Sequence, residues 1–138
     1  MSKGAATILE LLMVTSMATV MVGGVTINIQ DVLTEATDTQ RVANLRQLTV
    51  ALDLYYTDHD SYPQTSNFES ALSELALQGY IGSLPANPEL YAYTQTKKGQ
   101  GYILGTAIEN PESSYLTIDI DGILERVDCN DPFYCIKG

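Results

Sequence analysis

A long apolar segment near the start of the chain constrains its fold more than any other feature. Residues 5–29 read AATILELLMVTSMATVMVGGVTINI and contain one charged residue, Glu10. As an α-helix with about 1.5 Å rise per residue, the segment would be roughly 37 Å long, enough for a bilayer core of about 30 Å. A secretory signal would have a shorter apolar stretch that ends in a small-residue cleavage site. We therefore expect a retained membrane helix, and Lys3 indicates a cytoplasmic N-terminus.

An ionisable side chain inside such a helix is costly and usually has a partner or a function. Glu10 lies close to the basic end of the segment, where partial snorkelling lowers the cost. Opposite charges that meet in lipid stabilise each other, whereas a lone charge is strongly unfavourable. Glu10 is therefore either a tolerated interfacial acid or half of an ion pair that sets the register between copies.

The segment MSKGAATILELLMV resembles the N-terminus of type IV pilins and type II secretion pseudopilins. In that family a prepilin peptidase removes a short basic leader after a Gly, and the new N-terminus is methylated. A Glu at the fifth mature position then pairs with the terminal amine of a neighbouring subunit. The resemblance implies a leader of residues 1–4, cleavage between Gly4 and Ala5, N-methylation of Ala5 and an assembly salt bridge through Glu10.

This register departs from the family in one respect, because Glu10 becomes the sixth mature residue. Cleavage between Ala5 and Ala6, with a leader that extends to residue 5 and methylation of Ala6, would restore the fifth position. It would place Ala where the family strongly prefers Gly, so we favour the Gly4–Ala5 bond. A third possibility is that the chain is not processed.

Beyond Asp31 the hydrophobic pattern becomes one-sided. No Pro or Gly occurs from Val32 to Tyr56, and apolar residues recur mostly at three- and four-residue spacing, which is typical of an amphipathic helix. We expect one helix from about residue 6 to 57, stopped by Pro63. The predicted apolar stripe is Val32, Leu33, Ala36, Val42, Leu45, Leu48, Leu52, Tyr55 and Tyr56, and the predicted polar face is Glu35, Asp38, Gln40, Arg41, Asn44, Arg46, Gln47 and Asp53.

The stretch VANLRQLTVALDLYYTDHDSYP resembles the second half of the first helix in bacterial pilins and in type II secretion pseudopilins. The domain organisation that follows is a transmembrane and filament-core segment over residues 5–30 and a globular pilin head over residues 31–138. The fold class is α+β, the pilin fold, with a long N-terminal helix packed on an antiparallel sheet of about four strands.

Within the globular part, turn signals separate short elements. A capping box over Ser66–Glu69 and a C-terminal Gly79 predict a helix at about 67–78 that buries Phe68, Leu72, Leu75 and Ala76. The remaining pattern predicts strands at 91–96, 102–107, 115–120 and 123–128, with turns at Lys97–Gly101 and at Asp121–Gly122.

The two cysteines, Cys129 and Cys135, are separated by five residues, which is too wide for a redox CxxC pair. No second Cys/His pair completes a zinc site. We predict a disulfide that closes a short loop, which requires an oxidising location outside the cytosol.

Charge and motifs exclude several classes of function. The net charge of −10 belongs entirely to residues 31–138, because Lys3 and Glu10 cancel, so direct nucleic-acid binding is not expected. No nucleophile constellation or phosphate-binding loop occurs, and we predict neither enzymatic activity nor a cofactor.

His59, between two Asp residues, is better explained as solvated than as a metal ligand. Some pseudopilins bind calcium near the C-terminus; here Asp119, Asp121, Asp128 and Asp131 are weak candidates, and solvated turn acids are the simpler interpretation.

The resemblance implies a structural subunit of a type IV pilus-type filament that serves adhesion, motility or DNA uptake. Its partners would be copies of itself, minor pilins, the membrane before assembly, the prepilin peptidase and the assembly platform. It would reside in the inner or cytoplasmic membrane as a single-pass subunit and then in an extracellular pilus. The alternatives are a type II secretion pseudopilin and a monomeric membrane-anchored binding module.

Overall fold

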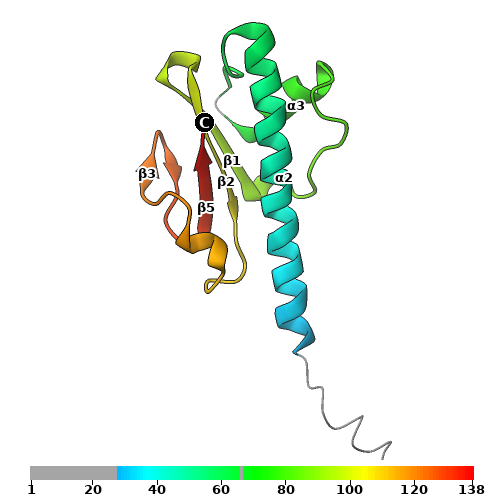
Figure 1. The fold of residues 1–138 in the computed structure, drawn as a ribbon, viewed down its shortest axis with the longest axis vertical. Helices are drawn as coiled ribbons and strands as arrows, with labels where there is room; N and C mark the ends of the chain where they lie inside the picture. The colour runs from blue at the N-terminus through cyan, green and yellow to red at the C-terminus, as the bar shows by residue number, and fades with distance from the viewer. Residues whose placement is uncertain (1–27, 66) are drawn as a thin grey trace, which may run out of the picture. The chain divides into compact units, whose positions relative to one another are not determined.

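The computed structural model describes residues 28–65 and 67–138 and shows an α+β architecture, in which a long helix packs on a small antiparallel sheet (Figure 1). The chain divides into two compact units, Met1–Val32 and Leu33–Gly138. We term the second unit the head and describe it by itself. The predicted membrane segment, residues 5–30, lies outside the described residues except at its last three positions. Within residues 28–65 and 67–138, no helix combines the length and the apolar character needed to cross a membrane.

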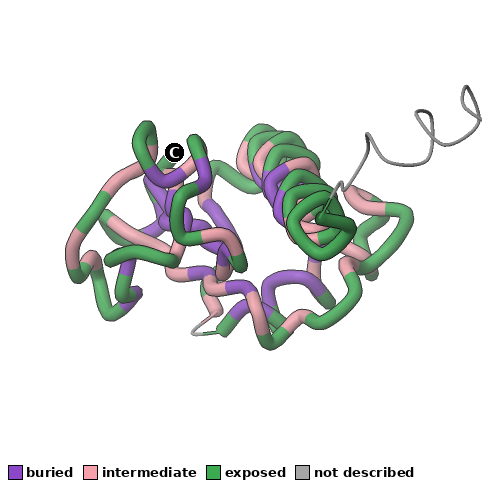
Figure 2. The backbone as a smooth tube through the Cα atoms, turned by 90° about the horizontal axis from the view of Figure 1, so that it is seen from below, coloured by how far each residue is buried: buried purple, intermediate pink, exposed green. Residues whose placement is uncertain are grey.

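The long helix, α2, spans Ile29–His59 and presents one face to the rest of the head. Its buried apolar residues recur at the spacing expected of an amphipathic helix: Val42, Leu45, Leu48, Ala51, Leu52 and Tyr55. In Figure 2 the buried part of α2 faces the sheet and the exposed part faces away. The helix ends two residues later than predicted, at a turn in which the Asp60 amide donates to the Tyr56 carbonyl and Asp60 has a positive φ of 56°.

The predicted apolar stripe is wrong at its N-terminal end. Val32, Leu33 and Ala36 are exposed, and the first buried residue of α2 is Asp38, which was assigned to the polar face. The reason is that the loop after β2 meets the helix at Asp38, whose carboxylate accepts two backbone hydrogen bonds from that loop. Whether a residue of α2 is buried therefore depends on which part of the head contacts it, and not on its own hydrophobicity.

The second helix, α3, spans Phe68–Leu77 and packs its apolar face against the same core. Its N-cap is Asn67, one residue after the predicted Ser66, and the Asn67 side chain accepts from the Ser70 amide at 2.8 Å. This cap shifts the start of the helix by one residue. Ala71, rather than the predicted Ala76, completes the buried face with Phe68, Leu72 and Leu75.

The C-terminus of α3 closes in a Schellman motif at the predicted glycine. The Gly79 amide donates to the Ala76 carbonyl at 3.1 Å, and the Tyr80 amide donates to the Leu75 carbonyl at 2.9 Å. Gly79 has a φ of +81°, in the left-handed region that side chains disfavour.

We expect Gly79→Ala to lower the free energy of unfolding by about 1 kcal/mol, because the left-handed conformation penalises a Cβ. No atom lies within 4 Å of a Cβ built at Gly79, so the cost is conformational and not steric. Gly82→Ala is the matched control, since Gly82 has equally open space and no positive φ. Urea titrations of both variants measure the difference, and equal midpoints would contradict the prediction.

The main sheet has three antiparallel strands in the order β1-β2-β5. Strand β1 is Tyr91–Thr96, β2 is Gly101–Ala107 and β5 is Phe133–Lys137. The predicted turn at 97–101 joins β1 to β2, with Tyr91 opposite Thr106. The core between the sheet and the helices is rich in tyrosine, and its strand residues are Tyr91, Tyr93, Tyr102, Leu104 and Tyr134. The described part of the head also contains three short 3₁₀ segments, Pro88–Leu90, Lys97–Gly99 and Ser114–Thr117.

The prediction of a four-stranded sheet is wrong. The predicted strand at 115–120 begins instead in a 3₁₀ turn, Ser114–Thr117, whose N-cap Ser113 accepts from the Tyr115 amide. Such local side-chain hydrogen bonds compete with strand formation. The other predicted strand, 123–128, folds back on itself as the hairpin of β3, Ile123–Leu124, and β4, Val127–Asp128. Its turn is Glu125–Arg126, both with positive φ, and not the predicted Asp121–Gly122.

The strand that the sequence analysis missed is β5. It lies in the segment that was assigned to a disulfide-closed loop, and it pairs with β2 from Ile103 opposite Lys137 to Ala107 opposite Phe133. This pairing makes β2 the central strand, which is consistent with the burial of nearly all its residues.

Candidate functional site

The N-terminal residues that the resemblance singles out lie outside the described residues. These are Gly4, Ala5 and Ala6 at the predicted cleavage and methylation site, and Glu10, the predicted half of an assembly salt bridge. In the head, the chemistry-bearing groups are a disulfide, a cluster of carboxylates beside it, and a buried ion-pair network on α2.

The predicted disulfide between Cys129 and Cys135 is present, with both residues fully buried. It ties the end of the β3–β4 hairpin to β5, and its sulfurs pack with Ile103 and Val127 in a small apolar cluster. Gly105 on β2 lies opposite Cys135, and a Cβ there would come within 2.9 Å of the Cys135 sulfur. The central strand therefore needs a glycine where the disulfide crosses it.

Three of the four predicted acidic residues come together next to this disulfide. Asp119, Asp121 and Asp131 each place a carboxylate oxygen within 4.8 Å of the other two. Asp128 does not join them, and its carboxylate instead accepts from the backbone amide and the side-chain amide of Asn130. The cluster forms because the Cys129 amide donates to the Gly122 carbonyl at 2.9 Å, which brings the segment before β3 against the loop before β5.

Asp119 is the most constrained member of this cluster. Its Oδ2 accepts from the Cys135 amide at 3.1 Å, whereas its Oδ1 is buried without a hydrogen-bond partner among the described residues. Burial raises the pKa of Asp119, and the neighbouring charges of Asp121 and Asp131 raise it further, while the hydrogen bond from Cys135 opposes the shift. Either a proton or a cation would relieve this repulsion, and clustered carboxylate oxygens are the ligands that calcium prefers.

We expect Asp119→Asn to stabilise the head at neutral pH. The folded-state pKa of Asp119 lies above its ordinary value of 3.8, so the folded state holds the proton more tightly than the unfolded state. The stability that this proton contributes is present below pH 3.8 and is lost as pH rises through the raised pKa. Asparagine removes the charge and can donate toward Asp121 or Asp131.

Urea titrations between pH 3 and pH 7 in the presence of a chelator would measure this effect. The stability difference between Asp119→Asn and wild type should grow with pH, and Glu112→Gln, at an exposed carboxylate outside the cluster, is the control. A difference that does not change with pH would contradict the assigned role of Asp119. Repeating the wild-type titration with millimolar calcium measures whether a bound cation stabilises the head as the Asp119→Asn substitution does.

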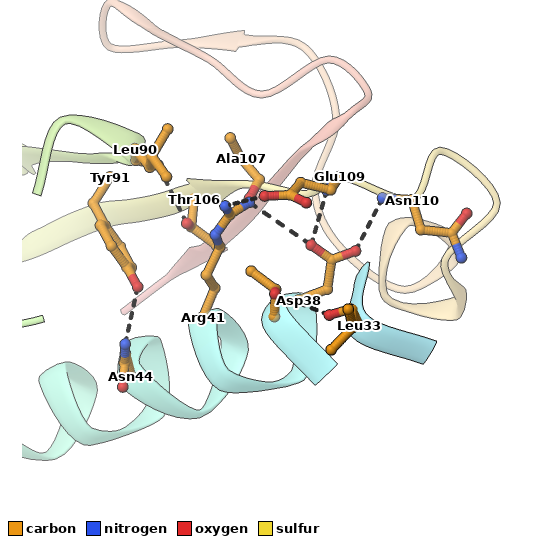
Figure 3. A network of polar contacts seen from close by, with 11 residues as sticks. Leu33, Asp38, Arg41, Asn44, Leu90, Tyr91, Thr106, Ala107, Glu109 and Asn110 are labelled. Carbon is orange, nitrogen blue, oxygen red and sulfur yellow. Dashed lines mark hydrogen bonds and ion pairs between the residues drawn. The ribbon is translucent and has the colours of Figure 1, made fainter. Parts of the chain in front are cut away.

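The buried ion-pair network lies where α2 meets the loop after β2 (Figure 3). Asp38 is 0% exposed, and its two carboxylate oxygens accept from the backbone amides of Glu109, at 2.8 Å, and Asn110, at 3.0 Å. Arg41, one turn later, donates to the Ala107 carbonyl at 2.9 Å and to the Glu109 carboxylate. It also lies 3.8 Å from Asp38. This network attaches the end of the central strand to the helix.

Sequence reasoning missed the network although a signal for it existed. Asp38 lies four residues before Val42 and seven before Leu45, so the helical period places it on the buried stripe. A carboxylate on that stripe needs buried donors, but the identity of the donors could not be read from the sequence, because they are backbone amides about 70 residues away.

His59 is exposed, as predicted, but it lies at the end of a helix and not in a loop. It is the last residue of α2, its ring stacks on Tyr55 with centroids 4.0 Å apart, and its Nδ1 lies 3.0 Å from the Tyr55 carbonyl oxygen. Among the described residues it does not belong to any group of potential metal ligands.

Comparison with known proteins adds no relative to this picture: no family model, no curated protein and no solved structure matches the chain significantly.

Proposed function

We propose that this chain is a structural, non-enzymatic subunit of a type IV pilus-type filament. The observation that carries the proposal is the arrangement of the N-terminal sequence. Glu10 is followed by residues 11–30, which contain no charged residue and no proline. The last two of these residues are the first two of α2. The lone acid requires a partner, and the resemblance to prepilin N-termini names that partner as the terminal amine of a neighbouring copy.

The same segment would serve two successive states of the subunit. Before assembly, residues 5–30 would hold the subunit in the membrane as a single span. After assembly, the same apolar surface would pack against copies of itself, with a gain of about 25 cal/mol per Å² relative to exposure in water. Burying one segment in either state accounts for its almost complete lack of charge.

The head is compatible with exposure outside the cell. Its disulfide is a type of cross-link that persists in oxidising compartments. Its strong negative charge favours solubility and keeps unrelated surfaces apart. A long helix packed on a small antiparallel sheet gives a compact head that begins with a helix.

A type II secretion pseudopilin is the second candidate. The stretch VANLRQLTVALDLYYTDHDSYP resembles the corresponding helix of both classes, so it supports either assignment. Both share the membrane-anchored monomer and the helix-packed polymer, and they differ in whether the polymer is a surface fibre or a short periplasmic one.

Electron microscopy of shear fractions, with an antibody against the head, tests the proposal. We expect labelled filaments from cells that produce the chain at its native level, and a mature N-terminus at Ala5 or Ala6 by mass spectrometry. Fibres that appear only on overexpression would favour the pseudopilin. A chain that retains residues 1–4 and never polymerises would contradict both, and would indicate a monomeric membrane-anchored binding module.

A further inference from the structure

Helix α2 carries a second ordered face that the core does not use. Its members recur at alternating spacings of three and four residues, which is the period of a helix–helix seam. None of them is charged. We term this set the outer stripe, and it consists of Leu33, Ala36, Gln40, Ala43, Gln47, Val50 and Leu54.

None of the residues of the outer stripe is buried, and the exposed part of α2 faces away from the sheet (Figure 2). At about 100° per residue, its members fall within a narrow sector roughly opposite Val42 and Leu45. Large apolar side chains are exposed along it, with Leu33 at 56%, Val50 at 60% and Leu54 at 51%. About six turns of solvent-facing helix surface without a charge are unusual on a head in which acidic residues outnumber basic ones more than two to one.

A groove runs beside the outer stripe and widens the uncharged surface. It has a volume of about 350 Å³ and lies between Asn44, Gln47 and Val50 of α2 and the loop after α3. The loop contributes Ile81, Leu84 and Pro85, and Leu84 is 59% exposed. A helix packed on the outer stripe would have this loop as one flank.

The charges around the outer stripe indicate which kind of partner would bind it. A bilayer surface is a poor partner, because helices that lie on membranes flank their apolar face with several Lys and Arg, whereas the exposed flank of the outer stripe carries one base, Arg46, against two acids, Glu35 and Asp53. Two copies of the acidic head repel each other over most of their surface, and the outer stripe is where they can approach without bringing carboxylates together. The stripe also follows the uncharged run of residues 11–30 closely in sequence, which is the surface proposed to self-associate.

The residue order along the outer stripe fits a parallel pair in register. Ala36 and Ala43 would form small layers that allow close approach of two helices. Gln40 and Gln47 would meet their counterparts, and paired amides satisfy each other's donors and acceptors. Val50 and Leu54 would form apolar layers at the distal end. An antiparallel pair would place Gln against Ala or Val and leave these amides without a partner across the seam, although Gln40 would keep its hydrogen bond to Asn44 on the same helix.

We propose that the outer stripe is the seam through which two membrane-anchored copies of this chain pair in parallel before assembly. The inference rests on the proposed function for one point, namely that residues 5–30 anchor every copy in the same membrane and thereby orient all α2 helices alike. It adds a specific dimer interface on the head, separate from the apolar segment.

Disulfide trapping of the full-length chain in its membrane tests this seam. The two native cysteines are bonded to each other, so single cysteines can be introduced at Ala36→Cys and Ala43→Cys. Mild oxidation of membranes that contain two differently tagged copies should give mixed dimers. Because a seam holds matched thiols at high effective concentration, we expect a yield roughly tenfold or more above that of the control. The control is Glu35→Cys, which is exposed but is turned by about 100° from Ala36.

A second variant separates the seam from chance collision. Adding Val50→Asp to the Ala43→Cys chain would place two carboxylates in one layer and should return the yield to the control level. Because Val50 is exposed, this change leaves the fold intact, which circular dichroism would verify.

Membrane fractionation and electron microscopy of the same cells separate the two proposals. Membrane-bound chains that form filaments but give equal yields at Ala43→Cys and Glu35→Cys would overturn the seam and leave the proposed function standing. Products that contain a different protein instead of a second copy would also overturn the seam. A chain found neither in the membrane fraction nor in filaments would remove the common orientation and contradict both proposals.

Discussion

Replacing Asp38 with alanine is expected to lower the free energy of unfolding of the head by about 3–5 kcal/mol, because two backbone amides would lose a fully buried acceptor at about 1–3 kcal/mol each. The side chain is completely buried and accepts the backbone amides of Glu109 and Asn110. Alanine would leave both amides without their acceptor and Arg41 without its closest acidic neighbour on the helix. The attachment of the central strand to α2 would be lost with them.

Urea titration of the full-length chain in detergent, followed by far-ultraviolet circular dichroism, measures this effect. Glu35→Ala, an exposed acid on the same helix, is the matched control and should change the stability by no more than about 0.5 kcal/mol. Asp38→Asn retains one acceptor oxygen and should fall between the two. A loss below about 1 kcal/mol for Asp38→Ala would show that water or rearrangement replaces the network.

The second large effect concerns Glu10. We expect Glu10→Leu to leave the chain in the membrane, because leucine is fully compatible with a membrane helix, and to reduce filament yield by roughly tenfold or more. The physical reason is that the amine of a neighbouring copy would be left as an unpaired charge in an apolar environment. The register between subunits would also lose its only charged contact within residues 5–30.

Quantitative immunoblots of shear fractions and membranes separate assembly from insertion in this experiment. Thr15→Leu is the control, because it makes the same segment more apolar without removing a charge. It should give normal filament yield. Normal yield from Glu10→Leu would refute the assembly salt bridge, and loss of the chain from the membrane would assign Glu10 to insertion instead.

Local signals in the sequence were sufficient for several elements of the head. The absence of Pro and Gly from Val32 to Tyr56 predicted α2, and Gly79 predicted the end of α3, because a left-handed residue is needed there. Strands β1 and β2 were predicted together with their turn, since adjacent strands depend on short-range pairing. The disulfide was predicted from the spacing of two cysteines and the lack of other metal or redox partners.

Prediction failed where a segment's state depends on a distant partner. The segment around Cys135 was assigned to the loop closed by the disulfide, and only pairing with β2 makes it a strand. Ser114–Thr117 has β-forming residues and remains a turn, because Ser113 satisfies its backbone locally and no strand edge is paired with it.

The sequence by itself determined the helical period of α2, its end to within two residues, the C-terminal cap of α3 and the pairing of the cysteines, because each depends on residues within a few turns of one another. Only the tertiary structure decided that Asp38 is buried while Leu33 is exposed, and that Asp119, Asp121 and Asp131 share one site without Asp128. Those outcomes depend on which distant backbone groups arrive beside each side chain. Every residue except proline has a backbone N–H donor, so the pattern of side chains in the sequence does not indicate which donors reach a given carboxylate.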